Sequence, residues 1–131
     1  MWYAAGCNHE PDAIGYAESE DGIHWEKEKN NPVLAPDPSY LWEQHKVVAP
    51  CVIKDDDCFY MFYVGHLHEE RAQVGLARSR DGKTNWEKHP ENPLICPTEG
   101  SWDSVAVYKP LFKGGKSWMM WYNGAAYEEP I

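Results

Sequence analysis

Apolar and aromatic residues are concentrated in short segments of this chain and recur with the period of a strand. Two segments, VVAPCVI (47–53) and SVAVYKPLF (104–112), are rich in β-branched and aromatic side chains. After the turn sequences KDDD and KGGK, each is followed by a second segment of the same kind, at 58–65 and 117–124. This pattern predicts two β-hairpins. No stretch shows a sustained apolar period of 3.6 residues with caps, so we expect essentially no helix.

Two further strands are predicted after the segment MWYAAG (1–6) and after the segment at 58–65. Small and apolar residues alternate with polar ones in AIGYAES (13–19) and QVGLARS (73–79). A Ser-x-Asp-Gly turn follows, in which the Asp is expected to bind backbone amides and the Gly to supply a positive φ. The more polar segments HWEKEKNNPVL (24–34) and NWEKHPENPLI (85–95) are predicted to form a last strand. Each unit should therefore contain four antiparallel strands.

The same unit occurs more than once, at a spacing of about 60 residues. The sequences MWYAAG, MFYVGH and MWYNGA place Tyr3, Tyr63 and Tyr122 60 and 59 residues apart. Further residues match in the same register: Gly15 and Gly75, Trp25 and Trp86, Asn31 and Asn92, Trp42 and Trp102, and Pro50 and Pro110. A repeated four-stranded unit is typical of a β-propeller blade, because one small sheet can bury both faces only against neighbouring sheets. Trp25 and Trp86 are then expected to pack between blades.

The predicted fold is all-β, a single domain over 1–131 made of a partial blade (1–41), a full blade (46–97) and a partial blade (101–131). About two blades cannot close a ring, since propellers have at least four. Two interpretations follow. The chain is a fragment of a longer enzyme, or it is a small protein whose termini complete a shared blade in a dimer or trimer.

Composition excludes several classes of partner. The net charge is −9, and the 12 basic residues are scattered among 21 acidic ones, which argues against nucleic-acid binding. The chain has neither an apolar run of bilayer length nor an export signal, so we expect no membrane association. The four cysteines form no C-x-x-C pair, so free thiols and a cytoplasmic location are expected.

Several motifs resemble a known group of enzymes. WDSVAVYKPLF, KSWMMWYNGA, the S-x-D-G…W turns and the NPL or NPV after them resemble the five-bladed propellers of glycoside hydrolase families 43, 32 and 130, including mannoside phosphorylases. The resemblance implies hydrolysis or phosphorolysis of a glycosidic bond by carboxyl groups. It also implies an acidic residue before the proline that opens the innermost strand. Ala49 and Lys109 hold those positions here.

Candidate ligand-binding residues are expected on the face where the innermost strands begin. Aromatic rings beside polar groups suit sugars, which offer both an apolar C–H face and a polar rim. Asp103 is the candidate catalytic acid, and a turn-capping role is its alternative. The candidate substrate-binding residues are Trp42, His45, His66, Trp102, Tyr108, Lys109 and Asn123, and His9 lies in a loop of the same face. Because Trp42 and Trp102 repeat, blade packing is their alternative role; Asn123 could instead begin a turn.

The sequence indicates no cofactor and no committed metal site. His66 and His68 lie two residues apart on a predicted strand, so with Glu69 or Glu70 they could hold a metal ion. A solvated polar loop is the favoured alternative.

Two functions remain open. The first is a glycoside hydrolase-like propeller that acts on or binds carbohydrate in a central pocket, with the expected acids replaced by Ala49 and Lys109. The second is a non-catalytic carbohydrate-binding or scaffold protein that forms a ring by oligomerisation.

Overall fold

The computed structural model, which describes residues 1–7 and 10–128, consists of three antiparallel sheets. The first sheet contains β1 (Trp2–Ala5), β2 (Ala13–Glu18) and β3 (Glu26–Lys27). The second contains β4 (Lys46–Asp55), β5 (Cys58–His66), β6 (Ala72–Ser79) and β7 (Glu87–Lys88), and the third contains β8 (Ala106–Lys113) and β9 (Met119–Ala125). Within these described ranges, the one helical element is a 3₁₀ turn, η1 (Leu41–Glu43). The predicted all-β fold of propeller blades is confirmed.

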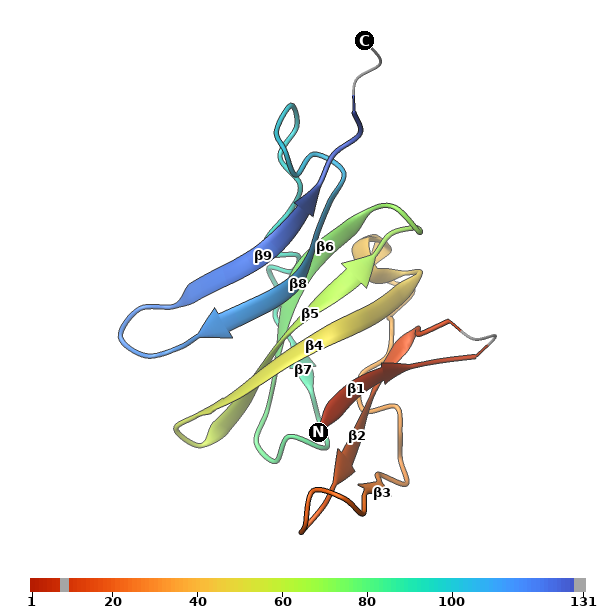
Figure 1. Cartoon of the computed structure of the whole chain (residues 1–131), viewed down its shortest axis with the longest axis vertical. Coiled ribbons are helices and arrows are strands. Elements are labelled where there is room, and N and C mark those ends of the chain that lie inside the picture. The colour runs from red at the N-terminus through yellow and green to blue at the C-terminus, as the bar shows by residue number, and fades with distance from the viewer. Residues whose placement is uncertain (8–9, 129–131) are drawn as a thin grey trace.

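The sheets follow one another in chain order and pack face to face (Figure 1). One buried cluster joins the first two sheets, with Ile14 and Leu34 against Val47, Met61 and Tyr63. A second cluster joins the second and third sheets. It contains Phe62, Val64 and Val74 on one side and Ala106, Val107 and Phe112 on the other. Each cluster is a blade interface, so the second sheet is the one covered on both faces. No helix in the described part of the chain has the length and apolar character needed to cross a membrane.

The last strand of each unit is much shorter than the sequence predicts. It consists of two residues, β3 or β7, followed by an isolated bridge, Ile14 to Leu34 or Val74 to Ile95. Between strand and bridge, an asparagine side chain takes over the pairing. The Tyr16 N–H donates to Asn31 Oδ1 (2.9 Å), and Asn31 Nδ2 donates to the Tyr16 carbonyl (3.1 Å). Asn92 bonds Leu76 in the same way, because a carboxamide offers the donor and acceptor of a peptide group.

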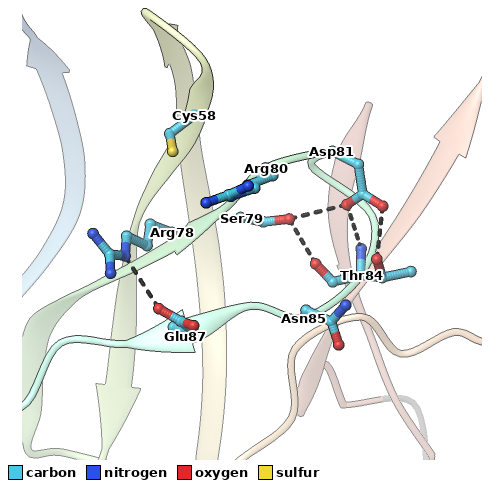
Figure 2. Close-up of a pocket in the computed structure, with 8 residues that line it drawn as sticks. All are labelled: Cys58, Arg78, Ser79, Arg80, Asp81, Thr84, Asn85 and Glu87. Carbon is cyan, nitrogen blue, oxygen red and sulfur yellow. Dashed lines mark hydrogen bonds and ion pairs between the residues drawn. The ribbon is translucent and has the colours of Figure 1, made fainter.

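The Ser-x-Asp-Gly turns are braced as predicted. Asp81 Oδ1 accepts a hydrogen bond from the Lys83 amide (2.9 Å). Oδ1 also accepts one from the Thr84 amide (2.8 Å), and Oδ2 accepts one from Thr84 Oγ1 (2.6 Å) (Figure 2). Asp21 binds the amides of Ile23 and His24 in the equivalent turn. Hydrogen bonds from the Thr84 side chain and backbone hold the pKa of Asp81 far below its usual value. Gly22 and Gly82 have φ values of 78° and 75°. These carboxylates are structural.

The predicted packing role of the two turn tryptophans holds for one of them. Trp86 packs against the cluster between the first and second sheets. Trp25, its counterpart in the first sheet, is exposed, so the prediction is wrong for Trp25. The reason is that the face of the first sheet that carries Trp25 has no neighbouring sheet among the described residues.

Trp42 packs into a hollow formed by two glycines on adjacent strands. A Cβ on Gly65 of β5, or on Gly75 of β6, would collide with the Trp42 ring. Trp102 lies over Gly124 of β9 in the same way, but no described residues form a strand of the third sheet in the position of β6. Trp42 is consequently 9% exposed and Trp102 61% exposed.

The residue after Trp42 forms a buried ion pair with the last strand of the same blade. Glu43 is fully buried, and its Oε1 accepts a hydrogen bond from Lys88 Nζ at 2.8 Å. Lys88 also donates to the Ala35 carbonyl (2.8 Å), so it ties β7 to the segment that leaves the first sheet. Glu43 Oε2 has no hydrogen-bond partner among the described residues, and burial raises the pKa of Glu43.

We expect Lys88→Met to destabilise the protein by about 3 kcal/mol at pH 8, because the mutation leaves the Glu43 carboxylate buried and unpaired. A raised carboxyl pKa in the folded state means that folding binds a proton, so stability falls as pH rises from the unfolded toward the folded pKa. The loss should therefore be smaller at pH 5. Urea denaturation at both pH values measures it. Lys29→Met, which removes an exposed lysine, is the control and should cost less than about 0.5 kcal/mol. Equal losses of stability in Lys88→Met and Lys29→Met would contradict a stabilising ion pair between Lys88 and Glu43.

Candidate functional site

The backbone turns out of the sheet at the two positions where the family resemblance implies an acid. The register of β4 and β5 shifts between Val48 and Cys51, and that of β8 and β9 shifts between Tyr108 and Leu111. Inside these bulges, Ala49 and Lys109 have φ values of 53° and 52°. Non-glycine residues in this region cost about 1–3 kcal/mol and concentrate at functional sites. The same bulge geometry is thus present in both repeats, and it holds an alanine in one and a lysine in the other.

A cavity of about 360 Å³ lies beside both bulges, between the second and third sheets. Its walls are largely small and apolar, and they include Ala49, Ala72, Ala106 and Ala125. The polar side chains in its lining are His66, Glu69, Glu70, Tyr108 and Lys109. Small walls leave room for a ring-sized ligand, and the polar groups give it a rim of donors and acceptors.

A network of ion pairs borders this cavity. His45 Nε2 lies 2.8 Å from Glu69 Oε1, while Lys46 Nζ lies 3.0 Å from Glu10 Oε1 and 3.4 Å from Glu69 Oε2. The hydrogen bond with His45, together with those involving Glu10 and Lys46, lowers the pKa of Glu69 to about 2. Glu69 is therefore an anion at neutral pH, and it is already paired.

The carboxylate and imidazole groups of this network differ from the metal-binding set that the sequence suggested. Potential ligand atoms of Glu10, His45 and Glu69 lie within 4.8 Å of one another. The Lys46 ammonium pairs with both glutamates of the set. His66 instead places Nδ1 3.3 Å from the His68 carbonyl, and burial lowers its pKa. Because the Lys46 ammonium already pairs with both glutamates, we interpret Glu10, His45 and Glu69 as an internal ion-pair network and not as a metal site.

The structure brings together three of the predicted substrate-binding residues. His66, Tyr108 and Lys109 line the cavity, and His45 lies next to it through Glu69. Asn123 pairs with Tyr108 in the β8–β9 ladder, but its side chain is exposed and outside the cavity lining. His9 lies outside the described residues.

The two tryptophans do not face the cavity. Trp42 is buried against Tyr63, with ring centroids 5.6 Å apart, so neither of its faces is open to a ligand. Trp102 stacks on Tyr122, with ring centroids 5.8 Å apart and an angle of 19° between the rings, and it lies outside the cavity lining. The packing role accounts for the position of Trp42.

Asp103 is positioned as a structural carboxylate. It is 3% exposed and accepts hydrogen bonds from the Thr98 amide and the Tyr122 hydroxyl, both at 3.3 Å. It does not line the cavity, so its geometry corresponds to the capping alternative. The equivalent residue, Glu43, is buried as well, and our sequence reasoning did not single it out. The sequence feature that could have identified Glu43 is the repeat of an acidic residue directly after a tryptophan, at Trp42-Glu43 and Trp102-Asp103.

A larger hollow, of about 550 Å³, lies at the opposite end of the strands, beside the Asp81 turn (Figure 2). Asp81 is occupied by the hydrogen bonds of its own turn, and Arg78 Nε lies 3.2 Å from Glu87 Oε2, while Arg80 forms no ion pair with another described residue. A hollow of about 620 Å³ occurs at the equivalent turn of the first sheet, around Asp21. Because the feature repeats with the turn, it belongs to the blade architecture.

Two solved structures with a similar fold are described as glycoside hydrolases. One, described as a glycoside hydrolase, superposes with a TM-score of 0.64 and 22% identity over 79% of this chain and 29% of its own. A family 117 glycoside hydrolase produced by the marine bacterium Zobellia galactanivorans gives a TM-score of 0.65 and 21% identity over 76% of this chain and 30% of its own. At these identities, the likeness concerns the fold.

The sequence comparisons reach further along the chain. An uncharacterized protein of Mycobacterium tuberculosis is 30% identical over 134 residues, which cover 97% of this chain and 42% of the relative. The chain thus spans less than half the length of this relative. The family described as glycosyl hydrolases family 32 N-terminal domain matches residues 1–126. The match includes both bulges, all three sheets and the cavity between the second and third sheets, and on this basis the chain belongs to the glycosyl hydrolase family 32 N-terminal domain family.

Proposed function

We propose that this chain binds carbohydrate in the cavity between its second and third sheets. The observation that carries the proposal is the pair of bulges at Ala49 and Lys109, which open beside one cavity at the start of the innermost strands. In the families that the sequence resembles, this is the position of a catalytic acid. Membership of a glycoside hydrolase family supports a saccharide as the ligand.

The lining of the cavity suits a sugar ring. Tyr108 supplies an aromatic face for the C–H groups of a pyranose or furanose, while His66 and Lys109 supply polar atoms for its hydroxyl groups. Glu70 accepts a hydrogen bond from the Tyr127 hydroxyl, so a segment near the C-terminal end of the described chain borders the same site. Ala49 and Lys109 cannot act as carboxyl catalysts. We therefore infer binding without turnover for this chain alone.

We expect Tyr108→Ala to weaken saccharide binding at least tenfold, because it removes the aromatic face, while Tyr40→Ala leaves binding unchanged. Tyr40 is exposed and lies outside the cavity lining. Isothermal titration of the chain with a panel of neutral and acidic oligosaccharides measures the affinities, and thermal melting of each variant checks that it is folded. A folded Tyr108→Ala variant with wild-type affinity would place binding elsewhere. Release of reducing sugar by the wild-type chain would contradict the inference of binding without turnover.

A ring-forming scaffold is the second candidate function, because one face of the third sheet carries large apolar side chains in solvent. Leu111 is 63% exposed and Trp121 53% exposed. Trp121 matches Phe62 in the repeat, and Phe62 is buried against the next sheet. Burying this face would provide a driving force for association.

We expect the purified chain to have a discrete mass of two or three times 15.1 kDa by light scattering on a sizing column, because a dimer or a trimer supplies at least four blades. A monodisperse species of 15.1 kDa at 100 μM protein would contradict self-association and leave the carbohydrate proposal intact.

A further inference from the structure

The two blade interfaces differ in one residue near the start of the innermost strand. In the register that matches the two bulge prolines, Lys46 of β4 is equivalent to Ala106 of β8. Both residues hold the same place in their ladders, because Lys46 pairs with His66 and Ala106 pairs with Ala125, the equivalent of His66. The second interface therefore has a methyl group where the first has a long cationic side chain.

In the first interface, the Lys46 side chain joins the loops of two adjacent blades. Its Nζ lies 3.0 Å from Glu10 Oε1, in the β1–β2 loop, and 3.4 Å from Glu69 Oε2, in the β5–β6 loop. The side chain of Lys46 is 13% exposed, so it is enclosed between these loops. The carboxylate of the preceding blade is thus bound by an alkyl ammonium group.

The second interface has the same carboxylate beside an open space. Glu70 is equivalent to Glu10 in the repeat, and Glu70 and Ala106 both line the cavity of about 360 Å³. The cavity therefore lies where the first interface holds the Lys46 side chain. Glu70 accepts a hydrogen bond from the Tyr127 hydroxyl, which is a neutral donor and does not balance the charge of a carboxylate.

The other charged groups of the lining do not take the place of that ammonium. Glu69 is already paired with Lys46 at the first interface. Lys109 Nζ lies 6.0 Å from the centroid of the Tyr108 ring, and Lys109 forms no ion pair with Glu70 within the described ranges. Glu70 is consequently the carboxylate of the lining that a ligand in the cavity can pair with.

We propose that the saccharide bound in this cavity carries a free amino group, which pairs with Glu70 as the Lys46 ammonium pairs with Glu10. This inference deepens the carbohydrate proposal above and rests on it. Ala106 leaves room for the amino group, and Lys109 donates hydrogen bonds to hydroxyl oxygens elsewhere on the sugar. Hydrogen bonds between charged groups are roughly twice as strong as those between neutral groups, so an N-acetylated sugar binds more weakly.

The first test is isothermal titration of the chain with matched pairs of amino sugars and their N-acetylated forms, of gluco, galacto and manno configuration. At a pH below the pKa of the sugar's amino group, one amino sugar should bind at least tenfold more tightly than its N-acetylated form. Sugar binding without such a preference in any pair would overturn this inference and leave the carbohydrate proposal standing. Absence of binding by every saccharide tested would overturn the carbohydrate proposal itself.

Glu70→Gln, which preserves the size of the side chain and removes its charge, assigns the preference to this residue. The advantage of the amino form should fall below threefold, while the affinity for the N-acetylated form is unchanged. Glu20→Gln is the matched control, because Glu20 is exposed in the turn at the other end of the strands, and it should retain the preference. A preference that persists in Glu70→Gln would overturn the inference.

The second test is Ala106→Lys, which places a lysine at the position equivalent to Lys46. Its ammonium should pair with Glu70 and fill the cavity, so affinity for the amino sugar should fall at least tenfold. Thermal melting checks that the variant is folded, and if it is not, the titration of Glu70→Gln decides the inference. A folded Ala106→Lys variant that binds the amino sugar with wild-type affinity would show that the cavity is not the position of the amino group.

Discussion

Burial of each sheet's two faces against neighbouring sheets is the interaction on which the rest of this structure depends. A sheet of four short strands is too small to hold a core of its own. The second sheet meets the requirement on both faces, with one apolar cluster toward the first sheet and another toward the third. The cavity, both bulges and the buried Glu43–Lys88 pair lie in or beside that second sheet. Equivalent residues of the outer sheets, such as Trp25 and Trp102, are exposed because their neighbours are absent from the described chain.

The repeat was sufficient to predict the local structure and insufficient to predict burial. Strand positions, the Asp21 and Asp81 turns and the near absence of helix depend on contacts within a few residues, and these were confirmed. The last strand was predicted too long, because the pattern does not reveal that the Asn31 and Asn92 side chains replace backbone pairing. Trp25 and Trp86 both follow a Ser-x-Asp-Gly turn and begin the sequence Trp-Glu-Lys, yet they differ in exposure, because only Trp86 packs against a neighbouring sheet.

At the site, backbone geometry and side-chain chemistry are separable. The bulge before each proline sets the direction of residues 49 and 109, and it is nearly identical in the two repeats, with φ values of 53° and 52°. The side chains there are alanine and lysine, so neither bulge carries a carboxyl group. Sequence reasoning located these positions through the proline and located Tyr108 and His66 near them. Sequence reasoning did not distinguish these cavity residues from the buried residues Trp42 and Asp103. The reason is that the loops at the start of the innermost strands supply residues both to the cavity and to the core.

Glu43 and Asp103 are equivalent residues of the repeat that are stabilised by different partners. Both follow a tryptophan that covers a glycine, and both are buried. Glu43 has a lysine from a later strand of its own blade, whereas Asp103 has the Thr98 amide and the Tyr122 hydroxyl. Burying a carboxylate without a partner destabilises the folded state, and hydrogen bonds from two neutral donors offset this effect at Asp103. Its side chain is also shorter by one methylene, which keeps it close to its own loop. The complete blade thus uses a charged partner supplied by its last strand. In the third sheet, the corresponding acid has only neutral hydrogen-bond donors among the described residues.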